Sequence, residues 1–189
     1  MSHSPDIATC LREGWSLYTH RPALLSGATA VVALINALVS WIPLANLLTY
    51  PVLLAGLYLL VMRIEQREEV SLGVLFDALP QVLPLVLASL LSGLLIAIGM
   101  FLLVIPGIYL AIAYGFTTLH IIDGGLDFWP AMEASRREIT QHFLSYVGLG
   151  LILIALIVAG AMVFGVGLLV ALPVCVAAHY RFYRRLHEA

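Results

Sequence analysis

The chain has 189 residues, of which 62% are hydrophobic and 11% are charged, and its formal net charge is −2. A soluble domain is roughly one quarter charged, and the mean hydropathy of +1.03 is too high for such a domain. The high hydrophobic content excludes a disordered chain, and the negative net charge excludes a basic nucleic-acid-binding protein. Two cysteines are too few for a disulfide scaffold. The composition predicts an integral membrane protein. Its expected partner is membrane lipid, and no nucleic-acid partner is expected.

The charged residues leave three long apolar stretches between them. No Asp, Glu, Lys or Arg occurs in residues 22–62, 78–122 and 139–180. One helix needs about 20 residues to cross the apolar part of a bilayer, and each stretch is about twice that length. Because lipid offers no partner to an unpaired backbone amide, the crossings must be helical. Each stretch therefore predicts a hairpin of two spanning helices.

In chain order, the six expected spans are residues 23–41, 44–62, 82–103, 106–121, 144–163 and 166–181. The chain turns within the three hairpins at Pro43 to Asn46, at Pro106-Gly107, and at Gly165 and Gly167. The expected fold class is all-α: a polytopic membrane protein with six transmembrane helices as three helical hairpins. A short cytoplasmic amphipathic helix precedes each hairpin, and the whole chain, 1–189, forms a single membrane domain.

The amphipathic segments follow from apolar residues at helical spacing. The residues that share one face are Ile7, Leu11, Trp15 and Tyr18 in the first segment, Leu72, Leu75, Phe76 and Leu79 in the second, and Phe128, Met132, Ile139 and Phe143 in the third. Ser71 can cap the second helix, and Glu133 and Arg137 are an i, i+4 pair on the third. Two roles stay open for these helices: a collar that binds lipid or a partner, or connectors that cover the ends of the bundle.

The hairpins are expected to be three copies of one unit. Four residues of the first unit recur in the last in the same order and at nearly constant spacing: Glu13, Thr19, His20 and Pro51 correspond to Glu133, Thr140, His142 and Pro173. Similarity at a fixed offset is the signature of an internal repeat. The predicted repeat units cover residues 4–63, 71–122 and 127–185.

The positions of the charges predict an orientation. An even number of crossings in each apolar stretch returns the chain to its starting side, so every charged residue and both termini lie on one face of the membrane. The basic residues are nine arginines, and an excess of arginine marks the cytoplasmic side. We therefore expect a multi-pass membrane protein with cytoplasmic N- and C-termini.

Two of the central spans carry a stripe of small residues: Ser89, Gly93 and Ala97 on one, and Gly107, Ala111 and Gly115 on the next. Helices associate in lipid through close backbone approach, which small residues permit. The stripes are predicted to pack against each other or against adjacent spans. A substrate groove along the same residues is the alternative.

Little reactive chemistry lies at membrane depth. The polar residues within the spans are Asn36, Asn46, Thr49, Ser89, Ser92, Thr117 and Thr118, and Asn36 is expected to bond across to another helix. Catalysis and ion transport within a membrane usually need ionisable groups, and the spans contain no Asp, Glu, Lys or Arg except at their cytoplasmic ends. We therefore expect no enzyme activity, no catalytic residue and no cofactor.

Four histidines lie at the charged ends of the spans: His20, His120, His142 and His179. If the fold brought several of them together, their imidazoles could bind haem or a transition metal. The sequence contains no H-x-x-x-H or C-x-x-C spacing. Histidine is also ordinary at an interface, because its ring has an apolar body and a polar tip. These histidines are thus weak candidates for a haem or metal site.

Three segments carry a resemblance to a known family: GMFLLVIPGIYLAIAYGF at 99–116, AMEASRREITQHF at 131–143 and LPVCVAAHYRFYRR at 172–185. The chain resembles a broad bacterial family of six-span membrane proteins, mostly of unknown function. It is also similar to the membrane domain fused to some glycerophosphodiester phosphodiesterases. The resemblance implies a six-span fold, and it places no catalytic residue of that hydrolase on this chain.

The sequence favours a non-catalytic function. We expect an accessory or scaffold subunit that organises lipid or a membrane protein complex, as a homo-oligomer or within a larger assembly. The alternative is a passive channel or transporter for a small neutral or apolar solute, lined by Ser, Thr, Asn and Gly. A conduit requires a polar path across the bundle, whereas a scaffold predicts a dry, filled interior.

Overall fold

The structure, a computed structural model, describes residues 6–42, 45–162 and 165–188, and most of these residues are helical. No strand occurs in these residues, so the all-α prediction is confirmed. The helices are α1 (Ile7–His20), α2 (Pro22–Val39), α3 (Ala45–Glu65), the 3₁₀ turns η1 (Leu72–Phe76) and η2 (Leu79–Gln81), α4 (Val82–Leu102), α5 (Val104–Ala113), α6 (Thr117–Ile122), α7 (Phe128–Gln141), α8 (Phe143–Met162) and α9 (Leu168–Glu188). Three predicted boundaries lie outside the described residues: Ser4, where the first repeat unit begins, Leu44, where the second span begins, and Val163, where the fifth span ends.

Five helical segments of the described chain are long and apolar enough to cross a membrane: α2, α3, residues 72–102, residues 104–122 and α8. This supports a membrane protein. The sixth predicted span coincides with α9, which is as long as α3 but carries Arg181, Arg184 and Arg185 near its end. The predicted span 106–121 is divided into α5 and α6 by a turn at residues 114–116.

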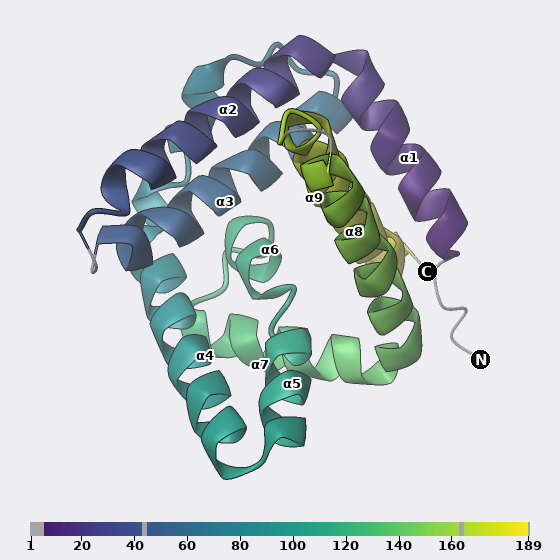
Figure 1. Cartoon of the computed structure of the whole chain (residues 1–189). Coiled ribbons are helices and arrows are strands. Elements are labelled where there is room, and N and C mark those ends of the chain that lie inside the picture. Colours follow the sequence, from purple (N-terminus) through teal and green to yellow (C-terminus); the bar gives the residue numbers. More distant parts are fainter. Residues whose placement is uncertain (1–5, 43–44, 163–164, 189) are drawn as a thin grey trace.

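The arrangement is organised around α9. Helices α1, α2, α3 and α8 all pack against it, and α4 packs against α5 (Figure 1). The contact of α1 with α9 is close, because a Cβ atom on Gly14 would lie 2.7 Å from the backbone nitrogen of Ala178. Figure 1 also shows that the α2–α3 and α4–α5 pairs diverge: the first ends at the left of the view and the second at the bottom.

Apolar side chains are distributed unevenly along the helix pairs. The largest fully buried side chains include Phe116, Tyr180, Phe182 and Tyr183, which lie in α9 and beside the start of α6. The distal ends instead expose large apolar residues, among them Trp41 and Phe101, each 89% exposed. In water such a surface would be unfavourable. In a bilayer it is the surface that contacts the lipid chains.

The first and third amphipathic segments form α-helices, α1 and α7. The pair of Glu133 with Arg137 is present, at 2.8 Å. On α1 the predicted face is rotated: Tyr18 is buried beside Cys10 and Gly14, whereas Trp15 is 51% exposed.

The second amphipathic segment differs from its prediction. Residues 72–81 form two 3₁₀ turns, and the Ser71 side chain makes no capping hydrogen bond. Pro80 contributes to this difference, because proline lacks an amide proton and its ring crowds the carbonyl group four residues earlier, which disfavours a continuous α-helix through this segment. Of the predicted apolar face, Leu75 is buried and Leu79 is 52% exposed.

The small-residue stripes, predicted to pack against each other or against adjacent spans, do not face each other. Gly93 and Ala97 are exposed, and a Cβ atom on Gly93 would meet nothing within 4 Å. Helix α5 approaches α4 near Gly99 instead: a Cβ atom there would lie 2.9 Å from the Cα atom of Gly107. Gly99 lies on another side of α4 from the predicted stripe, so spacing identified small residues without identifying the packed face.

The remaining stripe residues lie in different surroundings. Ser89 lines a cavity between helices, and Ala111 is exposed. Gly115 lies against the hydroxyl group of Tyr146, so it packs against α8 rather than α4. Of the six residues, Gly107 and Gly115 are therefore the ones at close helix contacts.

Candidate functional site

Three neighbouring cavities share the side chain of Tyr50 on α3. One, of about 450 Å³, lies between α2, α3 and α4. A second, of about 100 Å³, extends between α3, α4 and α6, and a third, of about 210 Å³, extends between α2, α3 and α9. Leu54, one helical turn after Tyr50, lines the second and third. We call this group of cavities the intramembrane cleft.

The cleft has a polar lining at a depth where the sequence is otherwise apolar. Its hydrogen-bonding side chains are Thr29, Asn36, Asn46, Tyr50, Ser89, Ser92, Tyr114, Thr117 and Thr118. Asn36 does not bond across to another helix as expected, since its Nδ2 donates to the Val32 carbonyl of its own helix at 3.0 Å. Burial of such groups is unfavourable unless they find partners.

Two lining atoms are buried and have no hydrogen-bond partner among the residues that the structure describes: Asn46 Oδ1 and Thr117 Oγ1. Thr117 is only 6% exposed, so its hydroxyl group cannot be satisfied by bulk solvent. An unpaired buried polar group costs about 1–3 kcal/mol. Together these atoms offer a donor and an acceptor to a neutral, hydrogen-bonding group that enters the cleft.

A partly buried chain of three side chains begins at Tyr58, the residue that follows the cleft residue Leu57 on α3. His179 Nδ1 is 2.6 Å from the Tyr58 hydroxyl, and His179 Nε2 is 2.9 Å from the Tyr146 hydroxyl. Because both ring nitrogens are engaged, one tyrosine donates to the imidazole and the other accepts from it. The ring of Phe116 lies 5.0 Å from that of His179. We call these four side chains the aromatic floor, which joins α3, α8 and α9 beside the start of α6.

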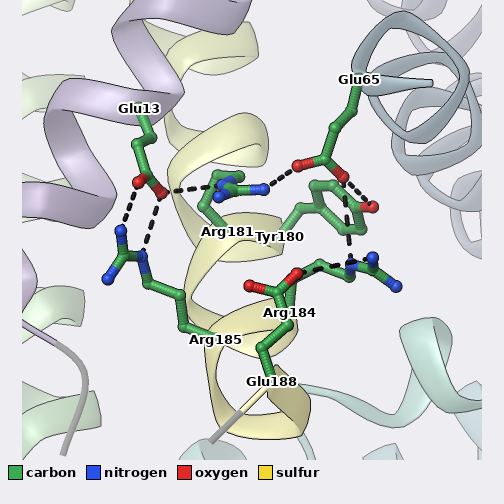
Figure 2. Close-up of polar contacts among 7 residues, drawn as sticks. All are labelled: Glu13, Glu65, Tyr180, Arg181, Arg184, Arg185 and Glu188. Atoms are coloured by element: carbon green, nitrogen blue, oxygen red, sulfur yellow. Dashed lines mark hydrogen bonds and ion pairs between the residues drawn. The ribbon is translucent and has the colours of Figure 1, made fainter.

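An ion-pair network joins α1, α3 and α9 (Figure 2). Glu13 accepts from Arg181 Nε at 2.8 Å and also bonds both Nε and Nη2 of Arg185. Glu65 pairs with Arg181 and lies 3.9 Å from Arg184 Nε. The hydrogen bond from Arg185 is the main reason why the pKa of Glu13 lies below its ordinary value.

Glu65 also accepts from the Tyr180 hydroxyl at 2.6 Å, which extends the network toward the aromatic floor. The first and last parts of the chain are thus tied together by charges that mostly satisfy one another. Such pairing makes the network a structural element that fixes α9.

The four predicted histidines do not converge. His20 Nδ1 lies 2.6 Å from the Ser16 carbonyl, and His142 Nδ1 lies 3.3 Å from the Glu138 carbonyl, both within one helix. His179 belongs to the aromatic floor. Only His120 meets other possible ligands, Glu138 and His187, and His187 was not among the predicted residues.

One pattern could have indicated His187. His179, Tyr183 and His187 are spaced four residues apart, which places them on one face of α9. That Glu138 and His120 meet this face depends on how α6 and α7 pack, which the sequence pattern alone does not show.

Comparison of the chain with protein-family models, with curated proteins and with solved structures finds no match. The function must therefore be inferred from the chemistry of the cleft and its surroundings.

Proposed function

We propose that this chain is a non-catalytic membrane protein, an accessory or scaffold subunit that organises lipid. In this proposal α9 is the sixth span, and the pairs α2–α3, α4–α5/α6 and α8–α9 are the three hairpins. The resemblance of residues 99–116, 131–143 and 172–185 to a six-span bacterial family agrees with this arrangement. The protein would lie in the inner membrane with its charged ends and both termini in the cytoplasm.

The observation that carries the proposal is the unpaired, buried hydroxyl group of Thr117 in the polar cleft. The cleft lies among apolar helices whose distal surfaces would contact lipid chains, so its most accessible ligand is a lipid molecule that enters from the bilayer. A lipid ester carbonyl group can accept a hydrogen bond from the Thr117 hydroxyl group, and a lipid hydroxyl group can donate one to Asn46 Oδ1.

Lipid retention tests this function. The full chain is purified in a mild detergent, and its mass and bound lipids are determined by native mass spectrometry. Wild type is expected to retain a lipid that Thr117→Val loses, because valine keeps the shape but removes the hydroxyl group. Thr49→Val is the matched control, since the Thr49 hydroxyl bonds the Ala45 carbonyl within α3. Equal retention by all three proteins would contradict the proposal.

The same masses test the role as a subunit. A scaffold is expected as a homo-oligomer or with other proteins bound, through the exposed apolar surfaces of α4 and α8. A protein that is monomeric and without protein partners under mild conditions would contradict the scaffold role, while leaving the lipid result unaffected.

A passive conduit for a small neutral solute is the second candidate, and the polar lining of the cleft favours it. A conduit requires passage through the aromatic floor, where Tyr58, His179 and Tyr146 are hydrogen bonded. Solute flux into liposomes separates the two functions. Flux through the wild-type monomer that increases in Tyr146→Ala would support the conduit, and absence of flux in both would reject it.

A further inference from the structure

A second cluster of polar side chains lies apart from the cleft, where α6, α7 and α9 meet. His120 Nε2 is 2.9 Å from Glu138 Oε2, and His187 Nδ1 is 3.4 Å from Glu138 Oε1. The three possible ligand atoms all lie within 4.8 Å of one another. We propose that His120, Glu138 and His187 bind a divalent first-row transition-metal ion such as Zn²⁺.

The separations between the ligand atoms fit such an ion. Metal–ligand bonds of roughly 2.1 Å at tetrahedral or octahedral angles place neighbouring ligand atoms about 3 to 3.5 Å apart. Each histidine lies at or next to such a distance from one oxygen of the Glu138 carboxylate, Oε2 for His120 and Oε1 for His187, so both carboxylate oxygens are available to the ion. Two imidazoles and one carboxylate suit zinc and iron rather than calcium or magnesium, which prefer oxygen ligands.

The surroundings position the ligands. The ring of Tyr183 packs against both histidines, 5.2 Å from the ring of His120 and 4.4 Å from that of His187, and the two histidine rings lie 5.7 Å apart. Its hydroxyl group donates to Asp123 at 3.3 Å, which orients the ring. His120 and Tyr183 are buried, so two of the rings in the cluster are held by packing and are not free surface side chains.

The electrostatics favour a cation. His187 lies in the last turn of α9, where the carbonyl groups of the helix end concentrate partial negative charge, and Glu138 adds a full negative charge. In the structure His187 Nδ1 also lies 3.0 Å from the Tyr183 carbonyl. To bind a metal ion, His187 Nδ1 must lose its proton, so the ring takes the tautomer with the proton on Nε2. The ring must also turn from the Tyr183 carbonyl toward Glu138.

With three protein ligands, the ion keeps at least one position for water or another small ligand. Its binding would connect the end of α9 to α6 and α7, which come from the second and third predicted units. This inference does not depend on lipid binding in the cleft, because the two sites share no residue.

Direct metal binding tests the proposal. The full chain is purified in detergent without a histidine tag and stripped with a chelator. Zn²⁺ is then titrated by calorimetry, and Co²⁺ by its visible absorption, which reports the coordination geometry. We expect one ion per chain for wild type. His187→Ala and Glu138→Gln should weaken binding by about tenfold or more, since loss of even an outer partner of a ligand costs that much.

His142→Ala is the matched control, because His142 lies close to Glu138 but bonds the backbone carbonyl of Glu138 and not its carboxylate. The affinity of this variant for Zn²⁺ should equal that of wild type. His187 is 45% exposed, so its replacement should leave the fold intact, which circular dichroism verifies. Absence of Zn²⁺ binding by the folded wild type, or equal affinity in all four proteins, would overturn the proposal.

Discussion

The hydroxyl group of Ser135 stabilises the break between α5 and α6. Its Oγ donates to the Ala113 carbonyl at 2.8 Å and accepts from the Phe116 amide at 3.0 Å. These two backbone groups flank the turn where the helix is interrupted, and Ser135 is fully buried. One side chain of α7 therefore replaces hydrogen bonds that a continuous helix would have made.

Ser135→Ala should destabilise the fold by about 1–3 kcal/mol, because it leaves a buried carbonyl and a buried amide unpaired. Thermal unfolding in detergent measures the change. Ser40→Ala is the control and should have little effect, since the Ser40 hydroxyl is exposed and bonds only the Ala37 carbonyl of its own helix. Equal unfolding temperatures for the two variants would show that the Ser135 bridge contributes little.

Gly115 and Gly93 should respond in opposite ways to a larger side chain. A Cβ atom on Gly115 would overlap the Tyr146 hydroxyl, whereas one on Gly93 would meet nothing within 4 Å. Gly115→Ala should therefore cost about 1–3 kcal/mol of stability through overpacking, and it should disturb the bond of Tyr146 to His179. Gly93→Ala should change stability by less than about 0.5 kcal/mol. Folded yield and unfolding temperature in detergent provide the comparison, and a larger loss in Gly93→Ala would contradict this assignment.

At the scale of elements, α1 is an integral part of the packed structure. Its face with Cys10, Gly14 and Tyr18 is buried, and α1 lies along α9. Burial raises the pKa of the Cys10 thiol to about 11, so this cysteine is protonated and unreactive at neutral pH. The contacts favour the connector role for α1 over that of a free collar helix.

The contact of α1 with α9 should weaken in acid. The pKa of Glu13 is lowered in the folded chain, mainly by Arg185, so its ion pairs stabilise the fold above about pH 4.5, the ordinary value for this group. That stability is lost as the pH falls through the lower, folded pKa. Unfolding temperatures of wild type should therefore decrease below about pH 4.5.

Glu13→Gln isolates this effect. At neutral pH it should cost on the order of 1 kcal/mol, because the ion pairs are partly screened by solvent, and it should flatten the acid dependence. Glu68→Gln is a control, since the Glu68 side chain is exposed and its carboxylate lies 3.8 Å from Arg63 Nε. An acid dependence in Glu13→Gln as steep as in wild type would contradict the role of Glu13.

At the scale of the whole molecule, apolar exposure and charge are separated. Large apolar side chains are exposed toward the distal ends of α2, α4 and α8, whereas ion pairs join α1, α3 and α9. A bilayer stabilises this separation because exposed apolar groups lie in lipid and charged groups in water. The proposed orientation follows from the same separation.

Cysteine labelling tests that orientation. In a background with Cys10 and Cys175 replaced by alanine, Trp41→Cys and Leu103→Cys should react from outside intact cells with a reagent that does not cross the membrane. Arg12→Cys and Gln66→Cys, at the charged end, should react only after permeabilisation. Outside labelling of the last two variants would refute cytoplasmic termini.

Several features could be predicted from the sequence because they depend on local composition. The absence of charge over residues 22–62, 78–122 and 139–180 predicted apolar helices, and the helical content is confirmed. The pair of Glu133 with Arg137 followed from spacing within one helix. The division into six spans and three repeats stays a prediction.

The cleft and the proposed metal site depend on tertiary structure. The face that each helix buries is set by its rotation against its neighbours, and this rotation turned Gly93 outward and placed Thr117 in the cleft. The meeting of His120, Glu138 and His187 joins three helices whose mutual positions no local pattern specifies. The chain's apolar segments thus determined where helices form, and only the packing of those helices determined which polar groups meet.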